Sequence, residues 1–169
     1  MLTLFGLEAS QMLKLSQLID AGHVALDVAS PDVPDLLNQL VKLLVSSDEL
    51  SEASAKALAE ALLRREQLGS TSIGRGVAVP HAYVVDLPTP TMLVARLERP
   101  IAYGEPEDGR PVDLVFLLIG PESARPKHAR VLARIVRLMH DQAWLEALRE
   151  ASSPEAVVEA IHDVERRHA

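Results

Sequence analysis

The spacing of hydrophobic residues along this chain changes repeatedly between the period of a strand and the period of a helix. Residues 24–28, 77–79 and 92–98 alternate as half-buried strands do. Residues 111–119 are apolar almost throughout, which is typical of a central strand covered on both faces. These four segments predict a sheet with a buried middle.

Between and after these strands, apolar residues recur three and four positions apart, which is the spacing of amphipathic helices. Asp and Ser are favoured at helix starts because their side-chain oxygens accept hydrogen bonds from the free amides of the first turn. The expected helices begin next to Asp32, Ser51, Arg125, Asp141 and Ser153. Strands interleaved with helices predict a three-layer α/β domain.

Composition narrows the class of protein. A length of 169 residues, 48% of them hydrophobic and 24% charged, fits one globular domain, and an aromatic content of 3% requires an aliphatic core. The formal net charge of −7 argues against a general nucleic-acid-binding role. The absence of cysteine excludes disulfides and thiol catalysis. With no basic N-terminal region and no apolar run of about 20 residues, we expect a cytoplasmic protein without membrane insertion.

Residues 69–81 read Gly-Ser-Thr-Ser-Ile-Gly-Arg-Gly-Val-Ala-Val-Pro-His, and this stretch holds the chain's densest group of functional features. Its glycines allow the backbone to approach a ligand closely, and its hydroxyl and amide groups can face an anion. Pro80 fixes its own φ and pushes Val79 towards an extended conformation, so His81 should leave the strand end in one direction. A histidine presented in this way is a candidate nucleophile or ligand. The alternative is an ordinary turn histidine.

Two nucleotide-binding motifs can be excluded at this stretch. A dinucleotide-binding fingerprint would require a third glycine where Val79 stands, and it would follow a strand, whereas the preceding residues have a helical pattern. A phosphate loop would require Gly-Lys followed by Ser or Thr, which the stretch lacks.

The stretch resembles the active-site signature of enzyme IIA of the bacterial phosphotransferase system, in its fructose, mannitol and nitrogen-regulatory class. The matching residues are Arg65-Glu66, Gly69-Ser70-Thr71, Ile73-Gly74 and Gly76-Val77-Ala78-Val79-Pro80-His81. The resemblance implies a mixed sheet flanked by helices, formed by residues 12–169, with residues 1–11 as an N-terminal extension. It also implies that His81 is transiently phosphorylated.

Two positions depart from this signature. Arg75 stands where asparagine is common, and we expect it to add a positive charge near the site. Ala82 stands where glycine often follows the histidine, and we expect it to stiffen the chain there.

Helix geometry separates two adjacent arginines. Consecutive helical residues point about 100° apart, so Arg65 continues the predicted apolar stripe through Leu62 while Arg64 stays on the solvated face. A guanidinium on the inner face requires an anionic partner. That partner is either the carboxylate of Asp113 or a phosphoryl group on His81, and the resemblance favours the phosphoryl group.

A second histidine, His128, lies on the expected inner face of the helix at residues 125–141. A lone histidine there is more often a packing residue than a site residue. However, His128 follows the loop after the central strand, where open α/β sheets commonly bind ligands, and it matches the second active-site histidine of the signature. The other residues expected on this inner face are Leu132, Ile135, Val136 and Met139. Beside them, Arg130, Arg134 and Arg137 form a basic stripe that is expected to be solvated or to receive an acidic partner.

These residues suggest a phosphoryl carrier. A histidine with an ordinary pKa of about 6.5 offers a neutral nitrogen near neutral pH, and transfer requires positioning and charge stabilisation with no metal or cofactor. We assign Arg65 as the charge clamp and His128 as a donor to a phosphoryl oxygen. The amides and hydroxyls of Gly69, Ser70, Thr71 and Ser72 would complete the phosphoryl-binding site.

The resemblance also implies the partners. The donor would be a histidine-containing phosphocarrier protein, and the acceptor would be an enzyme IIB cysteine or a regulatory target protein. We favour the nitrogen-regulatory type over the sugar-specific type because the chain carries no IIB-like or transmembrane IIC segment. Two alternatives stay open: a metal-dependent hydrolase that uses His81, His128 and Asp113, and a catalytically silent binding module.

Overall fold

The computed structural model describes residues 14–47, 49–85 and 87–169, so the expected extension at residues 1–11 lies outside the described part. Within that part, one mixed sheet contains six strands in the order β1-β5-β6-β3-β2, and β4 also pairs with β6. The strands are β1 (Val24–Val28), β2 (Ser72–Gly74), β3 (Val77–Ala78), β4 (His81–Tyr83), β5 (Thr91–Ile101) and β6 (Val112–Gly120). β3 and β4 run parallel to β6, whereas β5 runs antiparallel to it.

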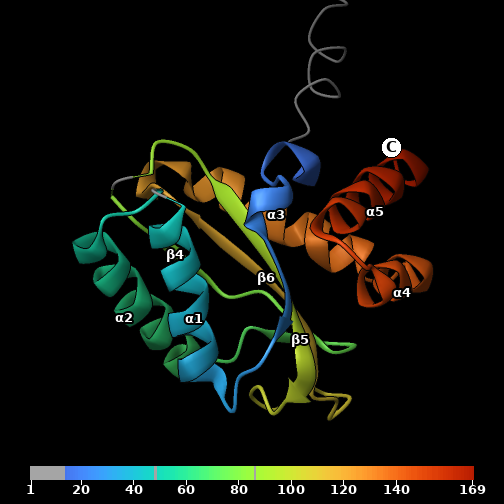
Figure 1. Ribbon diagram of the computed structural model, residues 1–169, viewed down its shortest axis with the longest axis horizontal. Helices are drawn as coiled ribbons and strands as arrows, with labels where there is room; N and C mark the ends of the chain where they lie inside the picture. The colour runs from blue at the N-terminus through green and yellow to red at the C-terminus, as the bar shows by residue number, and fades with distance from the viewer. Residues whose placement is uncertain (1–13, 48, 86) are drawn as a thin grey trace, which may run out of the picture.

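Helices cover both faces of this sheet, as Figure 1 shows. The helices α1 (Val33–Ser46) and α2 (Glu52–Leu68) cover one face. The opposite face carries α3 (Arg125–Leu138), α4 (Gln142–Glu150) and α5 (Pro154–Arg167). The short 3-10 helices are η2 (Leu15–Gln17), η3 (Ala21–His23) and η4 (Glu122–Ala124). A largely aliphatic core fills each interface, which confirms the predicted three-layer α/β/α architecture.

Side-chain caps begin four of these helices as the sequence predicts. In each of them the side-chain oxygen of the cap residue accepts a hydrogen bond from the backbone amide of the third helical residue. The four caps are Asp32 on α1, Ser51 on α2, Asp141 on α4 and Ser153 on α5. Helix α3 differs, because its N-cap residue is Ala124 and makes no side-chain cap.

The buried face of α3 is rotated from the predicted one. Val136 was expected to point inward but is 41% exposed, while Val131 and Leu138 are buried. Arg134, expected on a solvated basic stripe, is only 9% exposed. Its Nε donates to Glu165 of α5 at 3.1 Å, and this pairing makes the burial of the guanidinium tolerable.

β3 and β4 are two consecutive stretches of chain along the same edge of β6. Val77 pairs with Leu114, and four residues later His81 pairs with Leu118. Pro80 interrupts the pairing between them because it has no N–H to donate. His81 therefore begins a second short strand. The sequence suggested that His81 leaves the strand end, whereas in the structure it stays in the sheet.

Candidate active site

The imidazole of His81 is held by its own backbone. It is half-buried, and its Nδ1 lies 2.9 Å from the carbonyl oxygen of Val79. Because a carbonyl oxygen only accepts, Nδ1 is the nitrogen that carries the proton. In the neutral ring, Nε2 therefore keeps its lone pair and is the nucleophilic atom.

His128 lies on α3 and faces the same side of the sheet as His81. Its ring centroid is 4.9 Å from that of Tyr83, which follows His81 by two residues on β4 and so points to the same face. The ring also packs against Gly120, where a Cβ would lie 2.6 Å from the Nε2 of His128. A glycine at the end of β6 is therefore what lets this ring approach the sheet.

His128 is buried without a hydrogen bond. It is 1% exposed, and neither ring nitrogen has a partner among the described residues. Burial, reinforced by the charges of His81 and Arg125, lowers the pKa of His128 to about 4. The ring is therefore neutral at pH 7 and offers one N–H donor that is unused, a state that costs roughly 1–3 kcal/mol for a buried group.

The two adjacent arginines of α2 separate as predicted. Arg64 is exposed, whereas Arg65 is half-buried at the end of the helix, where its Nη1 donates to the carbonyl of Gly69 at 2.7 Å. Asp113 is not its partner, because Asp113 pairs with Arg149 through bonds of 2.8 and 2.9 Å. The sequence left Asp113 open as a structural partner of Arg65, and the structure excludes this pairing.

The predicted phosphoryl-binding residues divide into two groups. Thr71 is buried, its amide donates to Glu66 at 3.0 Å, and its hydroxyl contacts Glu66 and the hydroxyl of Tyr103. Thr71 therefore shapes the loop. Its amide and hydroxyl are already engaged and are not available to a ligand, contrary to the prediction. Ser70 is exposed, and the buried hydroxyl of Ser72 has no partner within the described residues.

Arg75 lies away from His81. With φ values of 56° and 77°, Arg75 and Gly76 form the turn between β2 and β3, and Gly76 pairs with Asp113 at the opposite end of β6 from Leu118. Five residues of strand separate these levels, or about 16 Å. The expectation that Arg75 adds a positive charge near the site is therefore wrong. The conformation explains why asparagine is common there, since asparagine tolerates positive φ better than arginine.

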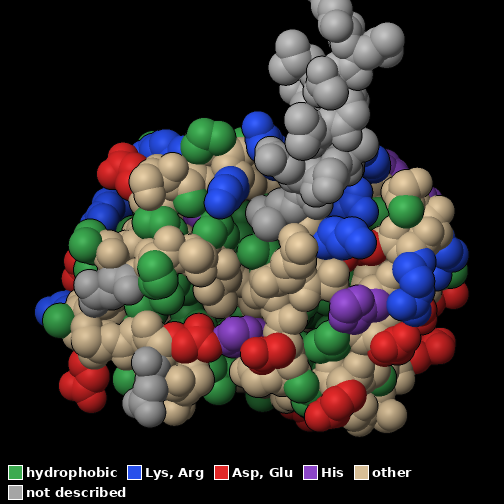
Figure 2. Space-filling view, turned by 90° about the horizontal axis from the view of Figure 1, so that it is seen from above, with side chains coloured by type: hydrophobic (Ala, Val, Ile, Leu, Met, Phe, Trp, Pro, Cys, Tyr) green, Lys and Arg blue, Asp and Glu red, His purple; other side chains and the backbone are tan. Residues whose placement is uncertain are grey.

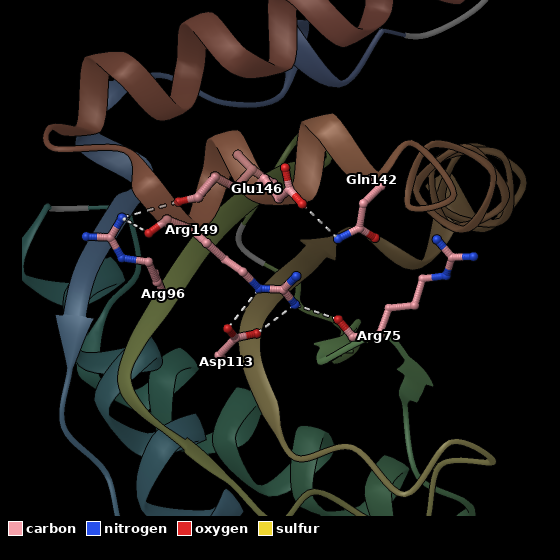
Figure 3. Close-up of polar contacts among 7 residues, drawn as sticks. Arg75, Arg96, Asp113, Gln142, Glu146 and Arg149 are labelled. Atoms are coloured by element: carbon pink, nitrogen blue, oxygen red, sulfur yellow. Dashed lines mark hydrogen bonds and ion pairs between the residues drawn. The ribbon is translucent and has the colours of Figure 1, made fainter.

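A network of hydrogen bonds holds this turn, as Figure 3 shows. The guanidinium of Arg149 binds both carboxylate oxygens of Asp113 and also donates to the carbonyl of Arg75. Asp113 is thus paired with Arg149, about 16 Å along β6 from the level of His81. The hydrolase alternative loses its carboxylate ligand.

Three further residues contact the candidate site residues, although sequence reasoning did not assign them a role there. Tyr83 and Arg125 form a stack with His128, since the guanidinium carbon of Arg125 lies 4.4 Å from the centre of the Tyr83 ring. Glu66 anchors the loop through Thr71. Two of them were detectable: Tyr83 shares the face of His81 at a spacing of two, and Arg125 precedes His128 by one helical turn. Ala82, between the histidine and the tyrosine, packs into the opposite core.

Comparison with known proteins agrees with this fold. The family model described as phosphoenolpyruvate-dependent sugar phosphotransferase system, EIIA 2, matches residues 17–164, and the chain belongs to this family. The predicted family, the α/β fold and a phosphotransferase role are thereby confirmed. The structure also has no helix, among its described residues, with the length and apolar character to cross a membrane.

Three relatives are the most informative. A nitrogen regulatory protein of Bradyrhizobium diazoefficiens is 45% identical over 118 residues, which are 70% of this chain and 76% of that protein. One from Pseudomonas aeruginosa is 32% identical over 154 residues, or 91% and 98%. The crystal structure of the nitrogen regulatory protein IIA-Ntr from Neisseria meningitidis has a TM-score of 0.76 at 31% identity, covering 86% of this chain and 97% of that chain.

Proposed function

We propose that this protein carries a phosphoryl group on Nε2 of His81. The observation that supports this most directly is the contact between Nδ1 and the Val79 carbonyl, which leaves Nε2 unprotonated and fixes the ring plane. In the transfer step, the Nε2 lone pair attacks phosphorus while the donor's phosphorus–nitrogen bond breaks and the donor nitrogen keeps the electron pair. The step consumes no cofactor.

Charge stabilisation in this step is assigned to His128 and Arg65. The neutral ring of His128 would donate its free N–H to a phosphoryl oxygen, which would satisfy a buried group that has no partner among the described residues. Arg65 would exchange the carbonyl of Gly69 for a phosphoryl oxygen, because a charge-assisted bond to an anion is stronger than one to a carbonyl. Ser70, Ser72 and the amides of the loop from Gly69 are further candidate donors.

The proposed donor is a histidine-containing phosphocarrier protein, and the proposed acceptor is an enzyme IIB or a regulatory target protein. The relatives that are 45% and 32% identical are both named nitrogen regulatory proteins, which favours the regulatory branch. Transfer from the phosphorylated chain to a sugar-specific enzyme IIB cysteine would instead favour the sugar-transport branch.

The test is the intact mass of the protein after incubation with phosphoenolpyruvate, enzyme I and the phosphocarrier protein. The wild type should gain one phosphoryl group that is labile in acid and stable in base, as a phosphoramidate is. His81→Ala should gain none, whereas His140→Ala, a change at an exposed histidine, should gain one. A phosphoryl group that persists in His81→Ala would overturn the proposal.

A further inference from the structure

We propose that Arg125, in the first turn of α3, is a further phosphoryl-binding residue that binds the group carried by His81. This inference rests on the proposed function. It assigns a binding role to a residue outside the matching signature, and it predicts that phosphorylation stabilises α3.

The first observation is that α3 begins without a side-chain cap. Ala124 occupies the N-cap position and has no side-chain acceptor, whereas the N-cap side chains of α1, α2, α4 and α5 each accept a bond from their own helix. The first amides of a helix have no acceptor within it, and they bind anions well. In α3, however, the amide of Arg125 already donates to the carbonyl of Glu122 in η4, and Pro126 has no N–H, so an anion at this turn would be bound mainly by side chains.

The second observation concerns charge. The first turn reads Arg125-Pro126-Lys127-His128, so two exposed cations lie at the positive end of the helix dipole and no carboxylate lies within that turn. Cations at this end destabilise a helix, whereas an anion stabilises it. Local conflicts of this kind are expected at functional sites. A doubly charged phosphoryl group would relieve the conflict.

The third observation points directly to a ligand. His128 completes the same turn, is 1% exposed, and has no partner for either ring nitrogen among the residues that the structure describes. Its contact with Tyr83 directs the turn to the face of β4 that carries His81, and a proton charge on the His81 ring would lower the pKa of His128. The cations of this turn and the unsatisfied imidazole thus meet beside the proposed phosphoryl position.

Arg125 is held loosely enough to change partner. Its guanidinium stacks on Tyr83 and pairs with Glu122 at 3.0 Å, but these two charged side chains are 60% and 75% exposed. An ion pair in water contributes little, so a phosphoryl dianion on His81 would compete successfully for the guanidinium. Figure 2, seen from above, shows charged side chains of both signs at the surface. The charged groups next to Arg125 therefore matter more for anion binding than the net charge of −7.

The experiment compares phosphorylated wild type, Arg125→Ala, Arg125→Lys and Arg130→Ala. Arg130 is the matched control because it is an exposed arginine on the same helix, about 140° around the axis from Arg125. The phosphorus NMR shift is followed against pH to titrate the phosphoryl group, and thermal melting is recorded before and after phosphorylation.

In the wild type and Arg130→Ala, we expect a lower phosphoryl pKa than in Arg125→Ala, by about half a pH unit or more, because a nearby cation favours the dianion. We expect phosphorylation to raise the melting temperature more in these two proteins than in Arg125→Ala. Arg125→Lys should recover part of both effects, since lysine restores the charge but not the fork of donors.

Equal phosphoryl titrations and equal melting shifts in Arg125→Ala and Arg130→Ala would overturn the role of Arg125 while leaving the proposed function intact. Failure of the wild type to accept a phosphoryl group on His81 would overturn both. The two failures are therefore distinguishable. Because Arg125 is exposed, its variants should fold. Melting of the unphosphorylated variants checks that each is folded.

Discussion

The two ends of β6 differ in how completely their polar groups are paired. At the end near Asp113, the guanidinium of Arg149 binds a carboxylate and a carbonyl (Figure 3). Arg96 donates to the carbonyls of Leu148, Arg149 and Ala151 at the C-terminus of α4. At the other end, His128 has no partner among the described residues and α3 begins without a side-chain cap.

This difference separates structural from functional polar groups. A buried polar group normally has a partner, so one without a partner requires an explanation. The paired end holds the turn at Arg75 in place, whereas the unpaired end is prepared for a ligand that would supply the missing acceptor. Changes at the paired end should therefore affect stability, and changes at the unpaired end should affect phosphoryl transfer.

The largest expected effect is at the paired end. Asp113→Ala leaves the guanidinium of Arg149, whose side chain is 16% exposed, without its carboxylate and should lower the free energy of unfolding by about 3 kcal/mol. Denaturant titration measures this loss. The rate of transfer per folded molecule should stay near that of the wild type, and a large fall in that rate would show that the paired end also serves the reaction.

Arg65→Ala should slow phosphoryl transfer by on the order of a hundredfold, as expected when one preorganised charge-stabilising group is removed. Arg64→Ala is the control, because Arg64 is exposed on the same helix and its loss should change stability by only a few tenths of a kcal/mol. The measurement is the transfer rate of each variant beside its melting curve. Equal rates for the two variants would remove Arg65 from the site.

His128 should make stability depend on pH. Its folded pKa of about 4 lies below its ordinary value of 6.5, so the unfolded state takes up a proton first as the pH falls. The wild type should therefore lose about 2 kcal/mol relative to His128→Gln as the pH falls from 7 to 4.5. Denaturant titrations of both proteins across this range provide the comparison. Parallel pH profiles would mean that His128 is not buried in its neutral form.

The smallest effect is expected at the turn. Arg75→Asn should raise the free energy of unfolding by roughly 0.5–1 kcal/mol, because asparagine adopts positive φ more readily and the carbonyl bound by Arg149 is retained. Transfer should be unchanged, since the turn lies about 16 Å from the level of His81. A faster or slower transfer in this variant would revive the expectation that Arg75 acts at the site.

Much of the fold was predictable because local rules dominate it. The alternation of residues 24–28, the apolar run of β6 and the caps at Ser51 and Asp141 act within one element, so the sequence reveals them directly. The rotation of α3 was not predictable in this way. Arg134 is buried because Glu165, 31 residues further on, pairs with it, and no pattern within α3 carries that information.

The candidate site was predictable only in part for the same reason. The signature identified His81, and His128 and Arg65 were placed on the correct faces of their helices. The engagement of Thr71 by Glu66 depends on how the loop folds back on α2. The position of Arg75 depends on strand pairing with β6, which sequence spacing alone does not give.

The most direct test of the central claim is the position of the phosphoryl group on the imidazole of His81. Nitrogen and phosphorus NMR of the protein, labelled with ¹⁵N-histidine and phosphorylated by the phosphocarrier relay, distinguishes the two ring nitrogens through their coupling to phosphorus. The contact between Nδ1 and the Val79 carbonyl predicts that Nε2 carries the group and that Nδ1 keeps its proton. Coupling at Nδ1, or a phosphoryl group on any other residue, would contradict it.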